Sequence, residues 1–266
     1  SGLVGYWSFD GKDVAGIPST ATNPGTVYDR SSQSNNGLYY NATGTLPVIG
    51  KIGQALNFDG SDDIVSVPDA ASIQNVFDSG GTYSAWIYPT DLPTTAIKTI
   101  IDKGSDFRIC NARVNNCTAA GDGINVLQFS TIWTTNGAWY TPDNSIKLNT
   151  WQHVAVTYKK TATTEVPTMY INGIAQTLRT QATPVGTQVS DVGSTLQIGF
   201  TDSNRQFSGK IDDVRIYNRV LTVDEIKRLY KIGGTLKVNT SISNDTLKNG
   251  LVGYWSFDGK DVAGIP

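Results

Sequence analysis

Apolar and polar residues alternate with a period of two along most of the chain. In the segment LVGYWSF, residues Leu3, Trp7 and Phe9 fall on one face, while Val4 and Tyr6 fall on the other. The segments DIVSV, TYSAWIY, NVLQFSTIW, QHVAVTY and KIDDVRIY show the same alternation. Because successive side chains of a strand point to opposite faces of a sheet, this pattern predicts many short strands. Clusters of Gly, Pro, Asn and Asp separate them, which is typical of an all-β antiparallel sandwich or jelly roll.

One segment, TVDEIKRLYKIGG, breaks the alternation and predicts the single helix of the domain. Thr222 is followed three residues later by Glu225, which is the spacing of a capping box at the start of a helix. Ile226, Leu229 and Tyr230 form one apolar stripe, and two glycines end the segment. The sequence therefore predicts a short C-terminal helix whose apolar side packs on the sandwich.

The segment GLVGYWSFDGKDVAGIP occurs twice without a change, at residues 2–18 and at residues 250–266. The copies start 248 residues apart, and a unit of that size buries a full core as one all-β domain. We therefore predict a domain over residues 1–232, a polar linker over 233–249, and the first strand of the next repeat over 250–266. The chain is then a slice of a tandem array. The alternative is a duplication introduced by cloning.

The charges of the chain nearly cancel, with 21 basic and 23 acidic residues. Because there is no basic stripe, we expect no nucleic acid as a partner. No run approaches the roughly 20 apolar residues of a membrane-spanning helix, so we expect no membrane span. Cys110 and Cys117 lie seven residues apart on a polar segment, and we expect them to close a small disulfide-bonded ring. A disulfide predicts an oxidising, extracellular or cell-surface location.

Several segments together resemble a known domain family. They are GLVGYWSFDG, YDRSSQSNNG, GKIGQALNFDGSDDIVSVPD, YSAWIYP, WQHVAVTY, YINGI and FSGKIDDVRIYNRVLTVDEIKRLY. In this order, from about Gly2 to Tyr230, they are similar to the laminin-G-like jelly-roll domain of the concanavalin A-like lectin/glucanase fold. The similarity is greatest to the repeated copies in long secreted surface proteins of bacteria and archaea. The resemblance implies two antiparallel sheets packed face to face, with the first strand next to the last.

If LVGYWSF pairs beside KIDDVRIY, each domain needs one copy of this first strand, and the chain carries two. An isolated amphipathic strand is unstable in water and offers its edge to other chains. We therefore expect the second copy to begin a following domain, to complete the sheet of a neighbouring molecule, or to be disordered. Addition to a neighbour would give a head-to-tail filament. The apolar residues of this inter-repeat strand are Leu251, Val252, Tyr254, Trp255 and Phe257.

The fold that the chain resembles includes glycosidases, which need a proton donor and a nucleophile or base at a fixed separation. Relatives carry these groups as E-x-D-x-x-E on one strand, and that motif is absent here. Glu225 belongs to the capping box, and Glu165 lies in a predicted turn. Adjacent aspartates such as Asp62 and Asp63 point to opposite faces of a strand. The single histidine, His153, lies in a predicted strand with a structural hydrogen bond as its expected role, so we expect no enzymatic activity.

A structural calcium ion is the cofactor that we expect, because hard cations take oxygen ligands from carboxylates, amides and carbonyls. The resemblance implies one calcium ion on the convex side, bound by an aspartate early in the last strand, which here is Asp212. Asp10 and Asp59 are its expected neighbours, and Asp29 with Asn36 forms a second candidate loop. The alternative is that these residues form turns and cap strand ends.

The segment STIWTTNGAWYTPDN offers Trp133, Trp139 and Tyr140 around an Asn-Gly turn as candidate glycan contacts. Trp133 also alternates with Phe129 and is a candidate for the core. The duplicated strand and the polar linker favour a structural repeat of an extracellular fibre or giant cell-surface protein, with neighbouring copies of itself as partners. The alternative is a lectin-like adhesion module that binds glycans.

Overall fold

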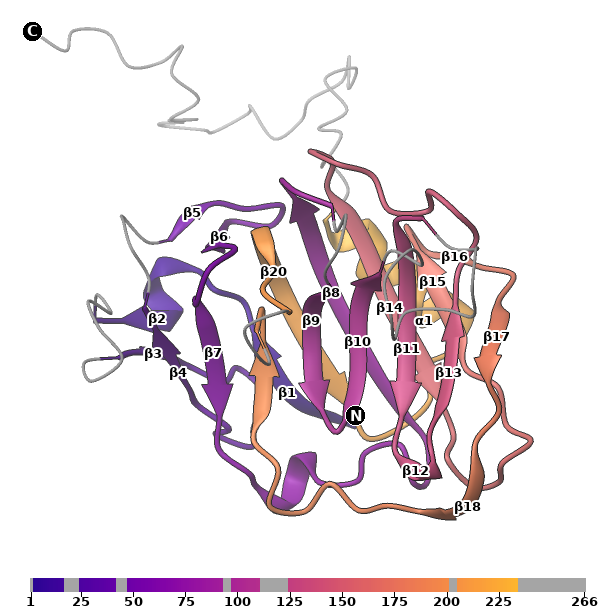
Figure 1. Ribbon diagram of the computed structural model, residues 1–266. Coiled ribbons are helices and arrows are strands. Elements are labelled where there is room, and N and C mark those ends of the chain that lie inside the picture. Colours follow the sequence, from indigo (N-terminus) through magenta and orange to yellow (C-terminus); the bar gives the residue numbers. More distant parts are fainter. Residues whose placement is uncertain are drawn as a thin grey trace, which may run out of the picture. The chain divides into compact units, whose positions relative to one another are not determined.

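The computed structural model describes residues 2–16, 24–41, 47–92, 97–110, 124–200 and 205–233. They belong to one compact unit, Ser1–Gly234, in which two antiparallel sheets pack face to face (Figure 1). The second copy of the repeated segment, at 250–266, lies outside the described residues. The predicted all-β sandwich is confirmed.

The first sheet contains both the first and the last strand of the sandwich. Its order is β16-β15-β14-β8-β20-β6-β5, and β1 also pairs with β20. Its eight strands are β1 (Leu3–Trp7), β5 (Val48–Ile49), β6 (Gln54–Asp59), β8 (Gly81–Pro89), β14 (Gln152–Tyr158), β15 (Thr168–Ile171), β16 (Ile174–Ala175) and β20 (Ser208–Tyr217).

The second sheet has the order β17-β13-β11-β10-β9-β19-β7-β4-β3-β2. Its ten strands are β2 (Val14–Ala15), β3 (Gly25–Val27), β4 (Gly37–Tyr40), β7 (Ile64–Val67), β9 (Lys98–Lys103), β10 (Ser105–Cys110), β11 (Val126–Thr131), β13 (Gly137–Tyr140), β17 (Arg179–Ala182) and β19 (Leu196–Ile198). A separate pair consists of β12 (Trp133–Thr135) and β18 (Val185–Gln188), and two short 3-10 helices are η1 (Gly11–Asp13) and η2 (Ala71–Ile73).

The core between the two sheets contains a cluster of aromatic rings. Tyr83 of β8 and Tyr158 of β14 come from the first sheet, whereas Phe129 of β11 and Trp139 of β13 come from the second. The ring centroid of Phe77 lies 4.7 Å from that of Tyr83 and 5.1 Å from that of Phe129. The Tyr158 ring lies 5.6 Å from both Phe129 and Trp139. Because tilted and edge-on ring pairs add to the energy of burial, this cluster fixes the two sheets to one another.

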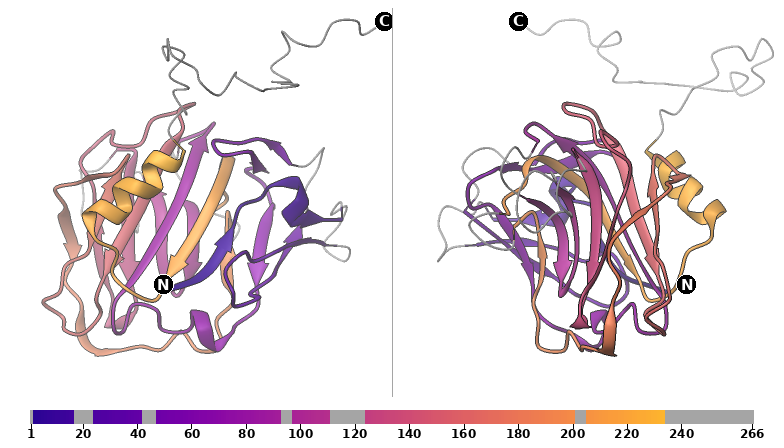
Figure 2. Two further views of the ribbon diagram at one scale, coloured as in Figure 1. Left: turned by 180° about the vertical axis from the view of Figure 1, so that it is seen from behind. Right: turned by 45° about the vertical axis from the view of Figure 1, so that its right-hand side comes forward.

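Helix α1 (Val223–Ile232) covers the outer face of the eight-stranded sheet (Figure 2). The predicted capping box is confirmed, since the Glu225 N–H donates to Thr222 Oγ1 and the Thr222 N–H donates to Glu225 Oε2. Ile226 and Leu229 are buried against Tyr170 of β15. No helix in the described part of the chain is long and apolar enough to cross a membrane.

Candidate functional site

The sandwich is completed where its first strand pairs with its last, and we call this pairing of β1 with β20 the strand seam. β1 runs antiparallel to the second half of β20, with Leu3 opposite Tyr217 and Trp7 opposite Val214. β6 pairs with the first half of β20, and β8 occupies the other side of that strand. Both sides of β20 are therefore filled within the domain, and its own first strand takes one of the places. This confirms the expected position of the first strand next to the last.

The outer edge of β1 is hydrogen-bonded to the loop that follows β3. The backbone N–H of Tyr6 donates to Asp29 Oδ1 at 2.9 Å. The side-chain amide of Asn35 donates to the carbonyl of Val4 at 2.7 Å, and the indole N–H of Trp7 donates to the carbonyl of Asn35 at 3.0 Å. An open strand edge is a template for pairing with another chain. This loop covers the edge at which a further strand would add.

Asp29, one of the metal candidates, holds this loop in shape. Its Oδ1 accepts from the N–H of Ser31 at 2.7 Å, and its Oδ2 accepts from the Ser31 hydroxyl at 2.6 Å and from the N–H of Asn35 at 2.8 Å. The N–H of Asp29 donates to Asn36 Oδ1 at 2.9 Å. Since protein donors already engage both carboxylate oxygens, the structure favours the turn-forming alternative for Asp29 and Asn36.

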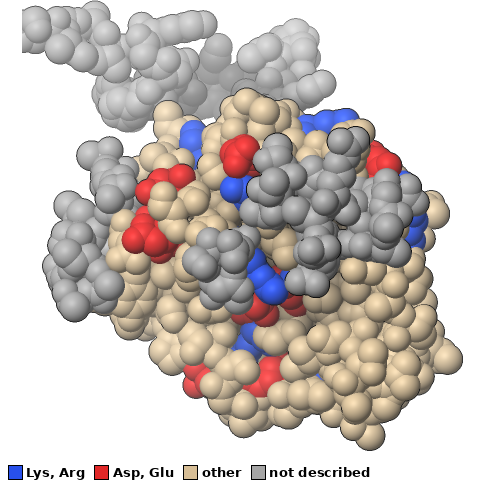
Figure 3. All heavy atoms as spheres, viewed as in Figure 1, with Lys and Arg blue, Asp and Glu red and all other residues tan. Residues whose placement is uncertain are grey.

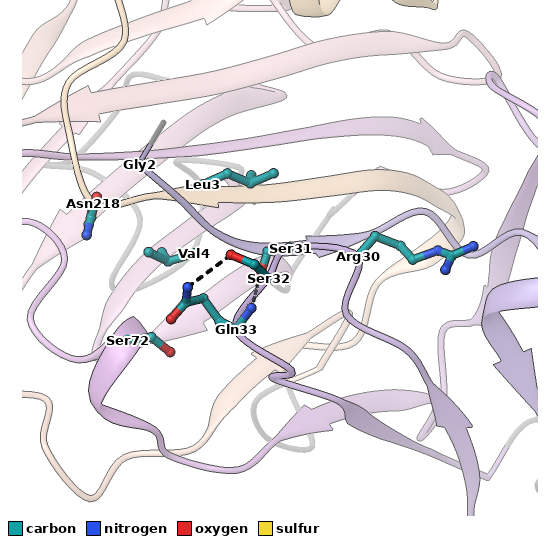
Figure 4. A pocket seen from close by; sticks show the side chains of 9 residues that line it. All are labelled: Gly2, Leu3, Val4, Arg30, Ser31, Ser32, Gln33, Ser72 and Asn218. Carbon is teal, nitrogen blue, oxygen red and sulfur yellow. Dashed lines mark hydrogen bonds between the residues drawn. The ribbon is translucent and has the colours of Figure 1, made fainter.

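A polar pocket of about 410 Å³ opens at the start of the seam (Figure 4). Gln33 Nε2 donates to Ser32 Oγ at 3.2 Å on its wall. The Arg30 side chain points away from these two residues in Figure 4, and its guanidinium forms an ion pair with Asp13 at 2.6 Å. The hydroxyl and amide groups of this pocket suit a neutral polar ligand. Its lining residues are Gly2, Leu3, Val4, Arg30, Ser31, Ser32, Gln33, Ser72 and Asn218.

Two of the expected calcium ligands, Asp10 and Asp212, come together at the other end of the seam. Asp10 follows β1 in the chain, Asp212 lies in β20, and the segment 51–54, which leads into β6, donates to both. The N–H groups of Lys51 and Ile52 each donate to Asp212 Oδ2 at 2.8 Å. The N–H of Gln54 donates to Asp10 Oδ1 at 2.9 Å. The pairing of the first and last strands thus gathers two carboxylates from opposite ends of the domain.

The surroundings of Asp212 fit a bound cation. The residue is fully buried, and its Oδ1 has no hydrogen-bond partner. Burial, together with the nearby charges of Asp213 and Asp10, raises the pKa of this carboxyl to about 7. The loop fits closely around both carboxylates, since a Cβ at Gly50 would lie 2.7 Å from Asp212 Oδ2 and one at Gly53 would meet Asp10 Oδ1. A buried, unpartnered carboxylate oxygen beside a second carboxylate is a donor set for calcium.

Asp59, the third expected ligand, lies at the opposite end of β6 and does not join Asp212. The register places Ser208, four residues before Asp212, opposite Asp59. The structure instead groups Asp59 with Asp62 and Asp63, one carboxylate oxygen of each lying within 4.8 Å of the others. The expected ligand set is therefore corrected to two separate acidic groups, because β6 carries Asp59 away from the seam.

The three candidate glycan contacts are buried. Trp139 is 1% exposed and belongs to the aromatic core, while Trp133 and Tyr140 are each 5% exposed. Tyr140 packs with Cys110 and Val126. None of the three offers an exposed ring face on which a sugar could stack, and this expectation is corrected by the packing of β11, β12 and β13.

Two further carboxylates, which the sequence analysis did not select, face each other on the outer side of the ten-stranded sheet. The register pairs Asp102 of β9 with Asp106 of β10 around Gly104. Asp106 forms ion pairs with Arg108 and, at 3.1 Å, with Arg205. Burial, together with the neighbouring Asp106, raises the pKa of Asp102 to about 6. Figure 3 shows acidic and basic side chains close together over the middle of this face.

A carboxyl with a raised pKa opposite an ionised carboxylate is a chemical requirement of glycoside hydrolysis. Asp102 and Asp106 lie neither on one strand nor next to each other in the sequence, and they meet only across the hairpin of β9 and β10. Two aspartates four residues apart around a glycine are the signal that identifies them. Their ion pairs also form a structural network, in which Arg108 Nε donates to Gln128 Oε1 at 2.5 Å.

His153 has the structural role that the sequence predicts. It is 1% exposed, and its Nε2 lies 2.9 Å from Ser84 Oγ. Burial lowers the pKa of the imidazole to about 3, so the ring is neutral at physiological pH. Its Nδ1 has no partner among the described residues, whereas a catalytic Ser–His pair needs a third group that orients the ring.

Two sets of candidates include residues outside the described part of the chain. Cys110 ends β10 and is buried, but Cys117 is not described, so the disulfide stays a prediction. The same holds for the second copy of the first strand, with Leu251, Val252, Tyr254, Trp255 and Phe257.

Comparison with known proteins agrees with this architecture. A protein-family model described as the concanavalin A-like lectin/glucanases superfamily matches residues 59–227. No curated protein matches the chain. Domain 4 of AbnA, an extracellular arabinanase from Geobacillus stearothermophilus in complex with arabinotriose, is 19% identical with a TM-score of 0.57, over 86% of this chain and 98% of that one.

Two other solved structures contain a similar domain within a longer chain. The binding domain of Paraclostridial Mosquitocidal Protein 1 is 17% identical with a TM-score of 0.62, over 86% of this chain and 52% of that one. The sialidase of Trypanosoma rangeli in complex with the inhibitor DANA is 17% identical with a TM-score of 0.54, over 86% of this chain and 33% of that one. At these identities the similarity shows the fold, and the function has to be argued from the site.

Proposed function

Because this chain belongs to the concanavalin A-like lectin/glucanases superfamily, we propose that it is a non-catalytic extracellular repeat, one closed β-sandwich unit of a tandem array. The observation that carries the proposal is the strand seam. β1 completes the sheet of its own domain, while the same segment occurs again 248 residues later. Because β20 is paired on both sides, this domain offers the second copy no place beside its last strand. The copy is then the first strand of a following unit.

The covered edge of β1 favours a covalent array over exchange of strands between molecules. A donated strand would have to displace β1 from β20 and break its contacts with the loop that contains Asp29 and Asn35. It would gain only the same contacts in return, because the two copies are identical in sequence. Strand exchange therefore offers no net gain in contacts, and units joined in one chain keep the pairing intramolecular.

The proposal includes a calcium ion at Asp10 and Asp212 that stabilises the strand seam. When bound, the ion would supply positive charge to the buried Asp212 Oδ1, which lacks a partner. Asp10 follows β1 and Asp212 lies in β20, so a shared ion would hold the first strand to the last. The expected disulfide of Cys110 and Cys117 fits the same extracellular setting.

The two identical strands provide a matched pair of substitutions that tests the proposal. In the intact chain, Trp7→Ala removes a fully buried side chain and should lower the free energy of unfolding by about 3–5 kcal/mol. Trp255→Ala, the same change in the second copy, should leave it unchanged. Light scattering should show a monomer for the unmodified chain. Oligomers that dissociate on Trp255→Ala would contradict the covalent array and show that the strand is donated to neighbours.

Glycan binding is the second candidate function, and the polar pocket at the start of the seam is the observation that favours it. The similar domain of the arabinanase was solved with arabinotriose. Binding of the intact chain to immobilised oligosaccharides, lost in the double variant Ser32→Ala and Gln33→Ala, would support this function. Gln176→Ala, on the loop after β16, is the control. Equal binding by both variants would exclude the pocket.

The non-catalytic part of the proposal has its own test, which is directed at Asp102 and Asp106. We expect no release of reducing sugar from arabinan, xylan or β-glucan by the intact chain. Hydrolysis that disappears in Asp102→Asn would contradict the proposal and identify the pair as an acid and its partner.

A further inference from the structure

The turn between β6 and β7 gathers three aspartates at a place where the chain changes sheets. β6 belongs to the eight-stranded sheet and β7 to the ten-stranded sheet, so this turn joins the two layers. Asp59 ends β6, and Asp62 and Asp63 directly precede β7. One carboxylate oxygen from each lies within 4.8 Å of the other two. Like charges held this closely repel one another unless a proton or a cation lies between them.

The hydrogen bonds of this turn leave one buried oxygen without a donor. The N–H of Asp59 donates to Asp63 Oδ2 at 2.7 Å, and the N–H of Ser61 donates to Asp59 Oδ1 at 2.7 Å. Asp63 is 4% exposed, and its Oδ1 has no partner. Burial, together with the charges of Asp59 and Asp62, raises the pKa of Asp63 to about 7. A buried acceptor without a donor is costly, and a cation is the ligand that would satisfy it.

No basic side chain among the described residues forms an ion pair with any of the three carboxylates. The buried Lys103 differs in this respect, since it pairs with Asp69 and Asp191. Asp59 and Asp62 are exposed, whereas Asp63 is buried. The cluster thus has a buried oxygen at its base and two ligands that face solvent, where water can complete the coordination shell.

We propose that Asp59, Asp62 and Asp63 form a calcium site that clamps the crossover from one sheet to the other. Calcium accepts an irregular set of carboxylate and water oxygens, whereas magnesium demands near-octahedral geometry. The site is distinct from Asp10 and Asp212, because the length of β6 separates the two groups by about 17 Å at 3.3–3.4 Å per residue. It does not depend on the proposed tandem array.

Calorimetric titration of the intact chain with calcium chloride tests the site, in an Asp212→Asn background that removes the other candidate. We expect this background to bind one calcium ion per chain. Asp62→Asn should weaken the affinity at least tenfold, because it removes one of three charged ligands. Asp224→Asn, an exposed aspartate of α1, is the matched control and should leave the affinity unchanged.

Asp62 is exposed, so its replacement should leave the fold intact, which far-UV circular dichroism checks. Asp59→Asn is the second variant and should have the same effect as Asp62→Asn. The proposal is overturned if the Asp212→Asn background binds no calcium at millimolar concentration, or if both variants bind it as tightly as the control. Tighter binding of magnesium than of calcium would overturn the choice of cation.

Discussion

Replacing Asp212 with asparagine removes a buried charge at the strand seam while it keeps an oxygen for the N–H groups of Lys51 and Ile52. The unmodified carboxyl has a pKa of about 7 in the folded protein because of its burial, compared with an ordinary value of 3.8. The folded state therefore binds more protons than the unfolded state between these two values. The proton on the Asp212 carboxyl therefore stabilises the folded state. This contribution to the free energy of unfolding is fully present below pH 3.8 and is lost as the pH rises through 7.

The size of the effect follows from the difference between the two pKa values. A shift of about three pH units corresponds to roughly 4 kcal/mol at 1.36 kcal/mol per unit. Part of this change falls below pH 5, so the change between pH 5 and pH 8 is about 3 kcal/mol. Without calcium, the free energy of unfolding of the native chain should fall by this amount more than that of Asp212→Asn. The contributions of the other titrating groups cancel in this difference between the two unfolding free energies, because both proteins contain those groups.

Urea unfolding followed by tryptophan fluorescence, at several pH values in the presence of a chelator, measures this difference. With excess calcium at pH 8, the native chain should instead have the higher free energy of unfolding of the two. The cation compensates the charge of Asp212 in the native chain, whereas Asp212→Asn has no charge at this position to compensate. Equal pH dependence of the two proteins, to within about 1 kcal/mol, would refute the assignment of a proton-linked, buried carboxyl to Asp212.

Four further predictions concern the packing of the domain. Trp139→Ala should lower the free energy of unfolding by about 3–5 kcal/mol in denaturant titrations, and any glycan binding that survives in the folded variant would exclude this ring as a contact. Asn35→Ala should cost about 1–3 kcal/mol, because it leaves the buried carbonyl of Val4 without its donor, and faster amide exchange in β1 would locate the loss. Thr222→Ala should cost about 0.5–2 kcal/mol through the lost helix cap. The imidazole of His153, with a pKa lowered to about 3 by burial, should show no NMR titration between pH 8 and pH 5; a midpoint near 6.5 would contradict its burial.

The periodic part of the fold could be predicted from the sequence because it depends on neighbours along the chain. Alternation placed Leu3, Trp7 and Phe9 on one face of the first strand, and Trp7 and Phe9 are buried in the core. The register shifts between Leu3 and Gly5, so that Val4 is also buried in the core and Leu3 is only half-buried. The capping box at Thr222 and Glu225 is also local, and it formed as predicted. The place of the first strand beside the last came from the resemblance to a family, because strand pairing across the whole chain leaves no local signal.

The candidate site was harder to predict because it depends on register between distant strands. A strand that carries Leu56 opposite Ile211 necessarily places Asp59 beside Ser208, far from Asp212. The sequence around Asp59 contains no information about that register. Asp102 and Asp106 show the opposite outcome. Neither residue was a candidate on its own, yet the hairpin places them opposite each other. Trp133 was ambiguous for a further reason: alternation shows which face a ring is on, but not whether that face is covered.

The strand seam also sets an order of events during synthesis of the chain. The sheet cannot be completed until β20 has been made, and its last residue, Tyr217, precedes Leu251 by 34 residues. At about 5–20 residues per second, a ribosome needs roughly 2–7 s to reach the second copy, whereas β-sandwiches fold in milliseconds to seconds. A sandwich that folds within this delay has its own β1 in place before the identical competitor emerges. In a chain of identical units, the spacing between the last strand of one unit and the first strand of the next delays the appearance of the competing strand. This delay protects each unit from mispairing with the next.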